Sequence, residues 1–260
     1  MSDIASPATL AHEPVIRRIG VPDVTASLAQ GWRDFLETPT QLFFLALIYP
    51  VAGLALGFVA SGNNLLTIVW PLIAGFALLG PIAALGIYEM SRRREQGLPV
   101  SVLNGMDVFR SAGIGSIIGV GLLLFVLFVA WLLVAEWIYR TTIGPDHPAS
   151  LADLWRLSTS TPEGFRLMLV GNLVGFVFAV AALAVSVVSL PLLLDRDVGT
   201  TEAIRTSVRA VAANPVPMAL WGLIVAGLLL LGSLPLLVGL AIVIPVLGHA
   251  TWHLYRRIVG

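Results

Sequence analysis

Long apolar runs alternate with short polar connections along this 260-residue chain. A helix of about 20 apolar residues crosses the roughly 30 Å hydrocarbon core of a bilayer. Six runs reach or approach that length, at about 40–60, 65–90, 113–137, 167–194, 216–231 and 235–254. The pattern predicts an all-α, polytopic membrane helix bundle of about six transmembrane helices.

The connections between the runs group them as three hairpins. Ser61-Gly62-Asn63-Asn64 separates the first pair and Gly232-Ser233-Leu234-Pro235 the last pair, and both are turn compositions. A longer loop, about 138–166, joins the third and fourth runs, and its LADLWRLS segment is expected to form a turn or two of amphipathic helix. We expect one transmembrane domain, 40–254, between a tail at 1–39 that carries an amphipathic helix and a tail at 255–260.

The arginines indicate the orientation, because short cytoplasmic loops of bacterial membrane proteins carry an excess of Arg and Lys. With six spans, one side of the membrane holds only Arg140, Arg156 and Arg166. The other side holds the remaining twelve: Arg17, Arg18, Arg33, Arg92, Arg93, Arg94, Arg110, Arg196, Arg205, Arg209, Arg256 and Arg257. This distribution predicts a bacterial inner-membrane protein with both termini in the cytoplasm.

A short amphipathic segment precedes each hairpin, at 25–39, 101–113 and 201–215. In the second of them Leu103, Met106 and Phe109 recur at helical spacing. Each segment is expected to lie as a helix in the cytoplasmic interface, with its apolar face toward the lipid. The first and third match loosely at an offset of 176 residues, which fits either an internal repeat or chance.

Two groups of arginines are candidate contacts for lipid headgroups or a partner protein. Arg92, Arg93 and Arg94 form a stop-transfer cluster at the end of the second run. Arg205 and Arg209 flank a predicted apolar stripe of a helix over 202–215, with Thr200 as its N-cap and Asn214-Pro215 as its end. The residues of that stripe are Ala203, Ile204, Val208, Val211 and Ala212. The alternative for this segment is a positively charged connecting loop.

The composition of the chain argues against several classes of function. The chain is 57% hydrophobic and 12% charged, and its formal net charge is zero, so nothing points to a nucleic-acid partner. It has no cysteine, which excludes disulfides and thiolate chemistry. It also contains no Walker loop, HExxH or GxSxG motif. We therefore expect no intrinsic catalysis and no cofactor.

Two further features could carry chemistry within the membrane. His249 and His253 lie four residues apart, a spacing that can chelate a metal, but no other histidine falls in a predicted span. Interfacial packing is the favoured interpretation of this pair, with a metal or haem site as the alternative. Asn172 is the most embedded strongly polar side chain, and either interhelical hydrogen bonding or a transport path would explain it.

Two stretches carry a family resemblance. GPIAALGIYEMSRRREQG at 80–97 and PLLLDRDVGTTEAIRTSVRAVAANPVPMALWGLIV at 191–225 resemble a bacterial family of predicted integral membrane proteins, a domain of unknown function. The resemblance extends from about Val15 to the C-terminus. It implies a multi-pass inner-membrane protein, and it assigns no activity or site residues.

These observations favour a structural or accessory membrane component that contacts lipids and a membrane-protein partner or a second copy of itself. A small permease or channel lined by Asn172 is the alternative, and a haem- or metal-binding membrane protein is a third interpretation.

Overall fold

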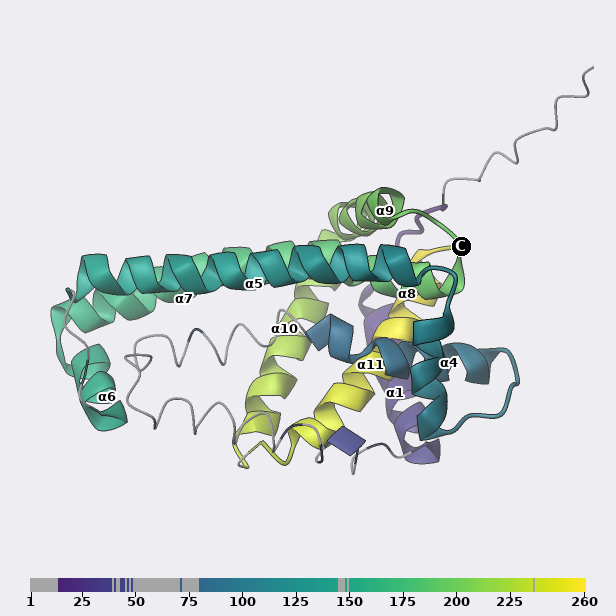
Figure 1. Ribbon diagram of the computed structural model, residues 1–260, viewed down its shortest axis with the longest axis horizontal. Helices are drawn as coiled ribbons and strands as arrows, with labels where there is room; N and C mark the ends of the chain where they lie inside the picture. Colours follow the sequence, from purple (N-terminus) through teal and green to yellow (C-terminus); the bar gives the residue numbers. More distant parts are fainter. Residues whose placement is uncertain are drawn as a thin grey trace, which may run out of the picture.

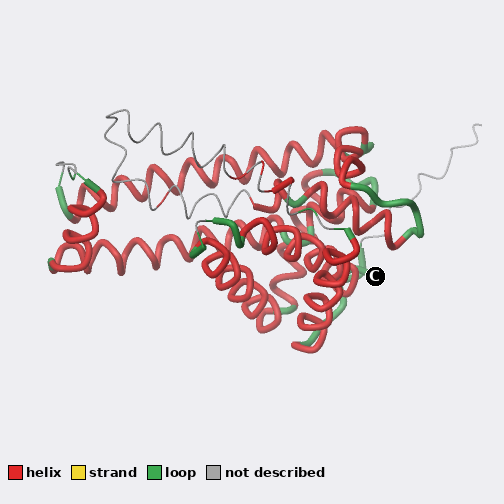
Figure 2. Tube along the Cα trace, turned by 90° about the horizontal axis from the view of Figure 1, so that it is seen from below, coloured by secondary structure: helices red, strands yellow, loops and turns green. Residues whose placement is uncertain are grey.

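The computed structural model describes residues 14–38, 80–144, 150–235 and 237–260, with the single positions 40, 43, 44, 46, 48, 71 and 148. The regular elements in these ranges are helical (Figure 2). The exception is an isolated antiparallel bridge between Ile16 and Val259. The expected all-α class is therefore confirmed for this part of the chain.

Two long antiparallel helices form an arm of the molecule (Figure 1). They are α5, Ile114–Thr142, and α7, Pro162–Ser186, with the short α6, Leu151–Ser160, between them at the tip. Thr161 caps α7 by accepting a hydrogen bond from the amide of Gly164 at 3.0 Å, and Pro162 and Glu163 fill its first turn. The indole of Trp131 on α5 packs against Gly175 of α7, where the absence of a side chain leaves room for it.

The other described helices gather mainly at the opposite end of this arm. They are α1 (Val21–Glu37), α4 (Leu85–Glu95), the 3₁₀ helix η2 (Val102–Arg110), α8 (Ser189–Asp195), α9 (Thr200–Ala213), α10 (Pro215–Ser233) and α11 (Leu240–Ile258). We call α1, α4, η2, α8, α9 and residues 249–258 of α11 the helical head. In Figure 1, α10 and α11 run steeply across the direction of α5 and α7.

Three described helices are long and apolar enough to cross a membrane. They lie at Ile114–Thr142, Pro162–Asp195 and Pro215–Ser233, close to the third, fourth and fifth predicted spans. The first predicted span, 40–60, and most of the second, 65–90, lie outside the described residues apart from a few positions. The sixth, 235–254, corresponds to α11, whose second half is buried in the head. The described part of the chain thus contains three candidate membrane-spanning helices.

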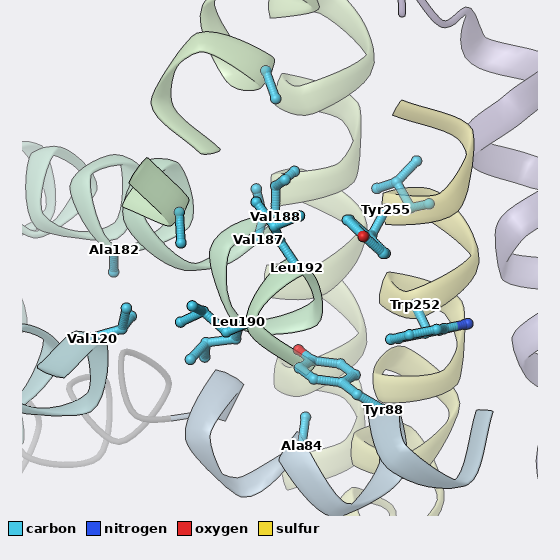
Figure 3. Packing of buried hydrophobic residues seen from close by; sticks show 14 of the residues in the cluster. Ala84, Tyr88, Val120, Ala182, Val187, Val188, Leu190, Leu192, Trp252 and Tyr255 are labelled. Atoms are coloured by element: carbon cyan, nitrogen blue, oxygen red, sulfur yellow. The ribbon is translucent and has the colours of Figure 1, made fainter. Parts of the chain in front are cut away.

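The core joins the arm to the head. Leu190 and Leu192 of α8 lie among Tyr88 of α4, Val120 of α5 and Trp252 of α11 (Figure 3). All five side chains are at most 2% exposed. Because α8 follows α7 almost directly, burial of its leucines fixes the end of the arm against the head.

Close packing of α1 on α11 depends on Gly31. A Cβ atom at this position would lie 2.5 Å from the backbone nitrogen of Ala250. The buried residues of α1 include Ser27 and Asp34 on the same face, beside Val24 and Phe35. This contact places polar α1 groups directly against the second half of α11.

Asn214 fastens the N-terminal segment to the junction of α9 and α10. Its Oδ1 accepts from the backbone nitrogen of Ile19 at 2.8 Å, and its Nδ2 donates to the carbonyls of Arg17 and Ala210. The predicted end of the helix at Asn214-Pro215 is confirmed, since α9 ends at Ala213 and α10 begins at Pro215. The predicted N-cap is wrong: Gly199 holds that position and Thr200 is already helical.

Candidate functional site

The two histidines of α11 meet a carboxylate of α1 inside the helical head. His253 Nε2 lies 2.8 Å from Asp34 Oδ2, and His249 Nδ1 lies 3.8 Å from the same oxygen. Residues four apart share one face of a helix, and this face of α11 packs on α1. The site therefore joins side chains that are more than 200 positions apart along the chain.

Ser91 of α4 connects His249 to Asp34. Its Oγ lies 2.6 Å from His249 Nδ1 and donates to Asp34 Oδ2 at 3.4 Å. Which of Ser91 Oγ and His249 Nδ1 donates depends on the tautomer of the ring. His249 Nε2, on the other side of the ring, is buried and has no hydrogen-bond partner among the described residues.

Arg94 adds a positive charge on the other side of Asp34. Its guanidinium lies 3.8 Å from Asp34 Oδ1 and also donates to Glu37 and Thr38. We call Asp34, Ser91, Arg94, His249 and His253 the carboxylate–histidine cluster. Three elements, α1, α4 and α11, supply its members, so it forms only when the head is assembled.

Burial and charge act differently on the two titratable groups at the centre of the cluster. Burial alone would raise the pKa of Asp34, but the His253 hydrogen bond and the charges of His253, His249 and Arg94 hold it below its usual value. Burial lowers the pKa of His249 from 6.5 to about 4, with Arg94 and His253 adding to the effect and Asp34 opposing it. Near neutral pH the cluster therefore combines an ionised Asp34 with a neutral His249.

The cluster predicts a loss of stability in mild acid. Between pH 6.5 and about 4 the unfolded chain binds a proton at His249 that the folded head does not bind, so stability falls as the pH falls through this window. At 1.36 kcal/mol per pKa unit the loss approaches about 3 kcal/mol. Thermal unfolding of the detergent-solubilised protein, followed by tryptophan fluorescence at several pH values, measures it.

The matched variant for this prediction is His249→Gln, which cannot titrate in the window. We expect its unfolding temperature to depend much less on pH between 6.5 and 4 than that of the unaltered chain. Equal pH dependence in both proteins would contradict the assignment of this effect to His249.

The cluster is not arranged as a nucleophilic relay. In a Ser–His–Asp triad the carboxylate holds the ring nitrogen opposite the one that faces the serine. Here Asp34 contacts the serine itself and the other histidine, and Ser91 is 1% exposed. Among the residues that the structure describes, no group of three or more His, Cys, Asp or Glu side chains could hold a metal ion. The geometry is that of a buried polar contact between helices.

The neighbouring arginines of the predicted 92–94 cluster are also paired within the chain. Arg92 makes a two-pronged ion pair with Glu89, whose side chain is 3% exposed, at 2.8 and 2.9 Å. Arg93 contacts Asp107 of η2 at 3.3 Å. With Arg94 on Asp34, each of the three arginines is directed to a separate carboxylate, and 22–30% of each side chain stays exposed. Their contact with lipid or a partner remains a prediction.

A second set of polar side chains, around Arg256, lies in the head beside the carboxylate–histidine cluster. Arg256 lies 2.9 Å from Glu95 and 3.1 Å from Asp195, and the hydroxyl of Tyr255 donates to Asp195 at 2.6 Å. Burial, together with the Asp195 carboxylate, raises the pKa of Tyr255, so the phenol stays a donor. Trp252 donates to Glu95 at 3.0 Å. These contacts tie α11 to α4 and α8.

The face with which α9 packs inside the head overlaps the predicted apolar stripe only in part. Ala203, Thr206, Ser207 and Ala210 are buried, whereas Val208 is 44% exposed. Of the other predicted stripe residues, Ile204 and Val211 are half-buried and Ala212 is exposed. The small residues are the buried ones because α9 packs closely on α7 and α8. At this contact Ser207 Oγ accepts a hydrogen bond from the amide of Val188.

Arg205 and Arg209 lie exposed on the outer side of α9, around Val208. Both take part in interactions within the chain. The structure therefore puts these two arginines on the surface with an apolar neighbour, and leaves their role as headgroup or partner contacts a prediction.

Asn172 is far from the cluster, on the arm. Its side chain is exposed on α7, and its Nδ2 donates to the carbonyl of Met168 on the same helix at 2.7 Å. It is thus not directed into the packed side of the α5–α7 pair. None of the other candidate residues from the sequence lies beside it.

Comparison with known families agrees with this architecture. Residues 69–195 match a family model described as predicted integral membrane protein (DUF2189). Over these residues the chain is similar to that uncharacterised membrane family. The match includes α4, the arm and α8, and confirms the predicted resemblance there. No curated protein and no solved structure matches the chain.

The family match and the site overlap only in part. Ser91 and Arg94 fall inside the matched residues, but Asp34 and both histidines fall outside them. The sequence drew attention to the histidine pair and to Arg94 and missed Asp34 and Ser91. The available signal was the spacing of Ser27, Gly31 and Asp34, which lines one face of the first amphipathic helix with small and polar residues.

Proposed function

We propose that this protein is a structural or accessory component of a bacterial cytoplasmic membrane, without catalytic activity of its own. The observation that carries the proposal is the segregation of its polar side chains. In the described residues, the buried carboxylates of the head and both histidines of α11 are hydrogen-bonded or ion-paired to other side chains of the head. The arm instead presents large apolar side chains such as Leu133, Leu173 and Phe176, each at least 60% exposed.

A permease is the alternative function, and the position of Asn172 argues against it. Polar groups in a transport path line the interior of a bundle or a water-filled cavity. Asn172 lies on the outer face of α7 and donates one amide proton to the carbonyl of Met168 on the same helix. This arrangement suits a contact between helices better than a path for a solute.

The proposed topology places both termini and the helical head in the cytoplasm and the tip of the arm outside. The segments richest in arginine lie in or beside the head, and α6 lies at the far end of α5 and α7 (Figure 1). The bridge between Ile16 and Val259 supports a common side for both ends of the chain. In this arrangement the apolar first part of α11, before Gly248, is the membrane-inserted part of the sixth predicted span, shorter than a full crossing of about 20 residues, and the head begins at His249.

The 3₁₀ helix η2 is proposed to rest on the cytoplasmic headgroups. Side chains three apart share one edge of a 3₁₀ helix. Leu103, Met106 and Phe109 have this spacing and are 76%, 64% and 72% exposed. Arg110 follows them, 88% exposed, within reach of phosphates. Only three residues separate η2 from α5, which suits a position at the membrane surface.

Reporter fusions test this topology. A periplasm-active reporter fused after Arg110, after Asp153 and after Gly260 is expected to be off, on and off. The reason is that α5 crosses the membrane between the first two positions and the chain returns before the third. An active reporter after Gly260 would contradict the cytoplasmic placement of the head.

Reconstitution distinguishes the accessory role from the permease. Liposomes containing the purified protein are expected to show no ion or small-solute flux above that of empty liposomes. Flux that is present with the unaltered chain and lost in Asn172→Leu would overturn the accessory role in favour of the permease.

A further inference from the structure

The outer face of α7 carries a polar side chain in the middle of an apolar surface. Phe165, Leu169, Asn172, Phe176 and Val180 recur three or four residues apart, and all five are exposed. The four apolar members are 43–65% exposed. Asn172 therefore sits at the centre of a face that no other described element covers.

Within the described residues, only one of the two donor protons of the Asn172 amide is used, and its acceptor oxygen is not. One amide proton goes to the carbonyl of Met168 at 2.7 Å. In the part of the chain that the structure describes, nothing donates to Oδ1, and the second amide proton is also unpaired. A carboxamide accepts through its oxygen and donates through its nitrogen, so one acceptor and one donor point outward together.

The depth of Asn172 in the membrane raises the free-energy cost of leaving its amide oxygen and second amide proton unpaired. It lies six positions, about 9 Å along the helix axis, beyond Arg166, the last charged residue of α7, and only apolar residues follow it up to Ser186. Apolar side chains precede and follow it on the same face, so water is not at hand at this depth in the bilayer. In hydrocarbon an unpaired amide favours association with another polar group.

We propose that this face of α7 is a dimerisation surface whose occupant is the same face of a second copy of this chain, with Asn172 of each copy bonded to Asn172 of the other. Identical chains inserted in the same direction carry the residue at the same depth. A twofold axis along the membrane normal therefore brings the two amides together, each donating to the other. Self-complementarity of the carboxamide selects a second copy rather than an unrelated helix.

Gly171 lets the two helices approach. A Cβ atom built on it would meet nothing within 4 Å, so its side of α7 is open. Small residues at such a contact allow backbones to come close enough for short polar side chains to bond. The inference deepens the proposed accessory role by naming the partner, and it rests on that proposal for the membrane location of the arm.

Cross-linking in native membranes tests the surface, and the absence of cysteine from the chain makes single-cysteine variants clean. Leu169→Cys puts a thiol one turn from Asn172. Leu133→Cys is the matched control, because α5 presents it at similar depth and with 68% exposure. Under mild oxidation we expect a disulfide-linked dimer for Leu169→Cys and only collisional background for Leu133→Cys. Equal cross-linking at both positions would refute the proposed surface.

The second arm of the test alters the amide itself in the Leu169→Cys background. Asn172→Leu should lower the dimer association constant roughly eightfold, as expected for two interhelical hydrogen bonds. Asn172→Gln, which keeps the amide, should retain most of it. Undiminished dimer in Asn172→Leu would refute the role of the amide, and a cross-link to another protein instead of a dimer would refute the second copy as occupant. Flux through liposomes, which decides between accessory and permease roles, is a separate readout from all three outcomes.

Discussion

Asp34→Ala is expected to destabilise the helical head by about 3–5 kcal/mol, the range for breaking a buried ion pair by removing one partner. Asp34 is 7% exposed and accepts from His253 and Ser91 while facing Arg94. Its loss leaves a guanidinium and two polar side chains without their shared acceptor. Chemical unfolding in mild detergent, followed by the fluorescence of buried Trp252, measures the change.

Glu37→Ala is the control for this prediction because it removes a second carboxylate from the same arginine. Glu37 is 69% exposed, so its ion pair with Arg94 is solvated. Such pairs contribute at most about 1 kcal/mol. Equal losses in the two variants would show that burial of the cluster does not determine its strength.

Gly31→Ala is expected to separate α1 from α11 and destabilise the head by about 1–3 kcal/mol, as overpacking does elsewhere. The added Cβ would lie 2.5 Å from the nitrogen and 2.7 Å from the Cβ of Ala250, so the helices must move apart. Because α1 would then open more often, trypsin should cleave after Arg33 faster than in the unaltered chain.

Gly227→Ala provides the comparison, since Gly227 lies inside α10 and a Cβ there meets nothing within 4 Å. Alanine is the better helix former, so stability should stay level or rise slightly. A loss in Gly227→Ala as large as in Gly31→Ala would mean that helix propensity, and not the contact with Ala250, sets the effect.

Apolar periodicity was enough to predict the arm. The runs 113–137 and 167–194 correspond to α5 and to α7 with α8, and Thr161-Pro162-Glu163 starts α7 as its composition indicates. These features are local: run length, a cap and a proline act within a few residues. The break at 232–235 is local in the same sense, and α10 ends there at Ser233.

The site could be predicted only in part, because its contacts are remote in sequence. Spacing alone shows that His249 and His253 share a face, but not that Asp34 lies opposite. On α9 the apolar pattern placed Ala203 and Val208 on one stripe, but the structure buries Ala203 together with Ser207 and leaves Val208 44% exposed. The short distance between α9 and its neighbours α7 and α8 determined which face is buried, and the hydrophobicity pattern of α9 does not report that distance.

The bridge between the two ends of the described chain has a consequence for biosynthesis. The amide of Arg17 bonds to the carbonyl of Ile258 at 2.7 Å, and the amide of Gly260 bonds to the carbonyl of Val15 at 3.1 Å. On a ribosome, α1 emerges early and must wait for nearly the whole chain before α11 exists to cover it. During that interval Asp34 and the α1 face around Gly31 have no native partner on α11. Nascent chains stalled before residue 249 should therefore be substrates for chaperones or proteases, and release of α11 should end that exposure.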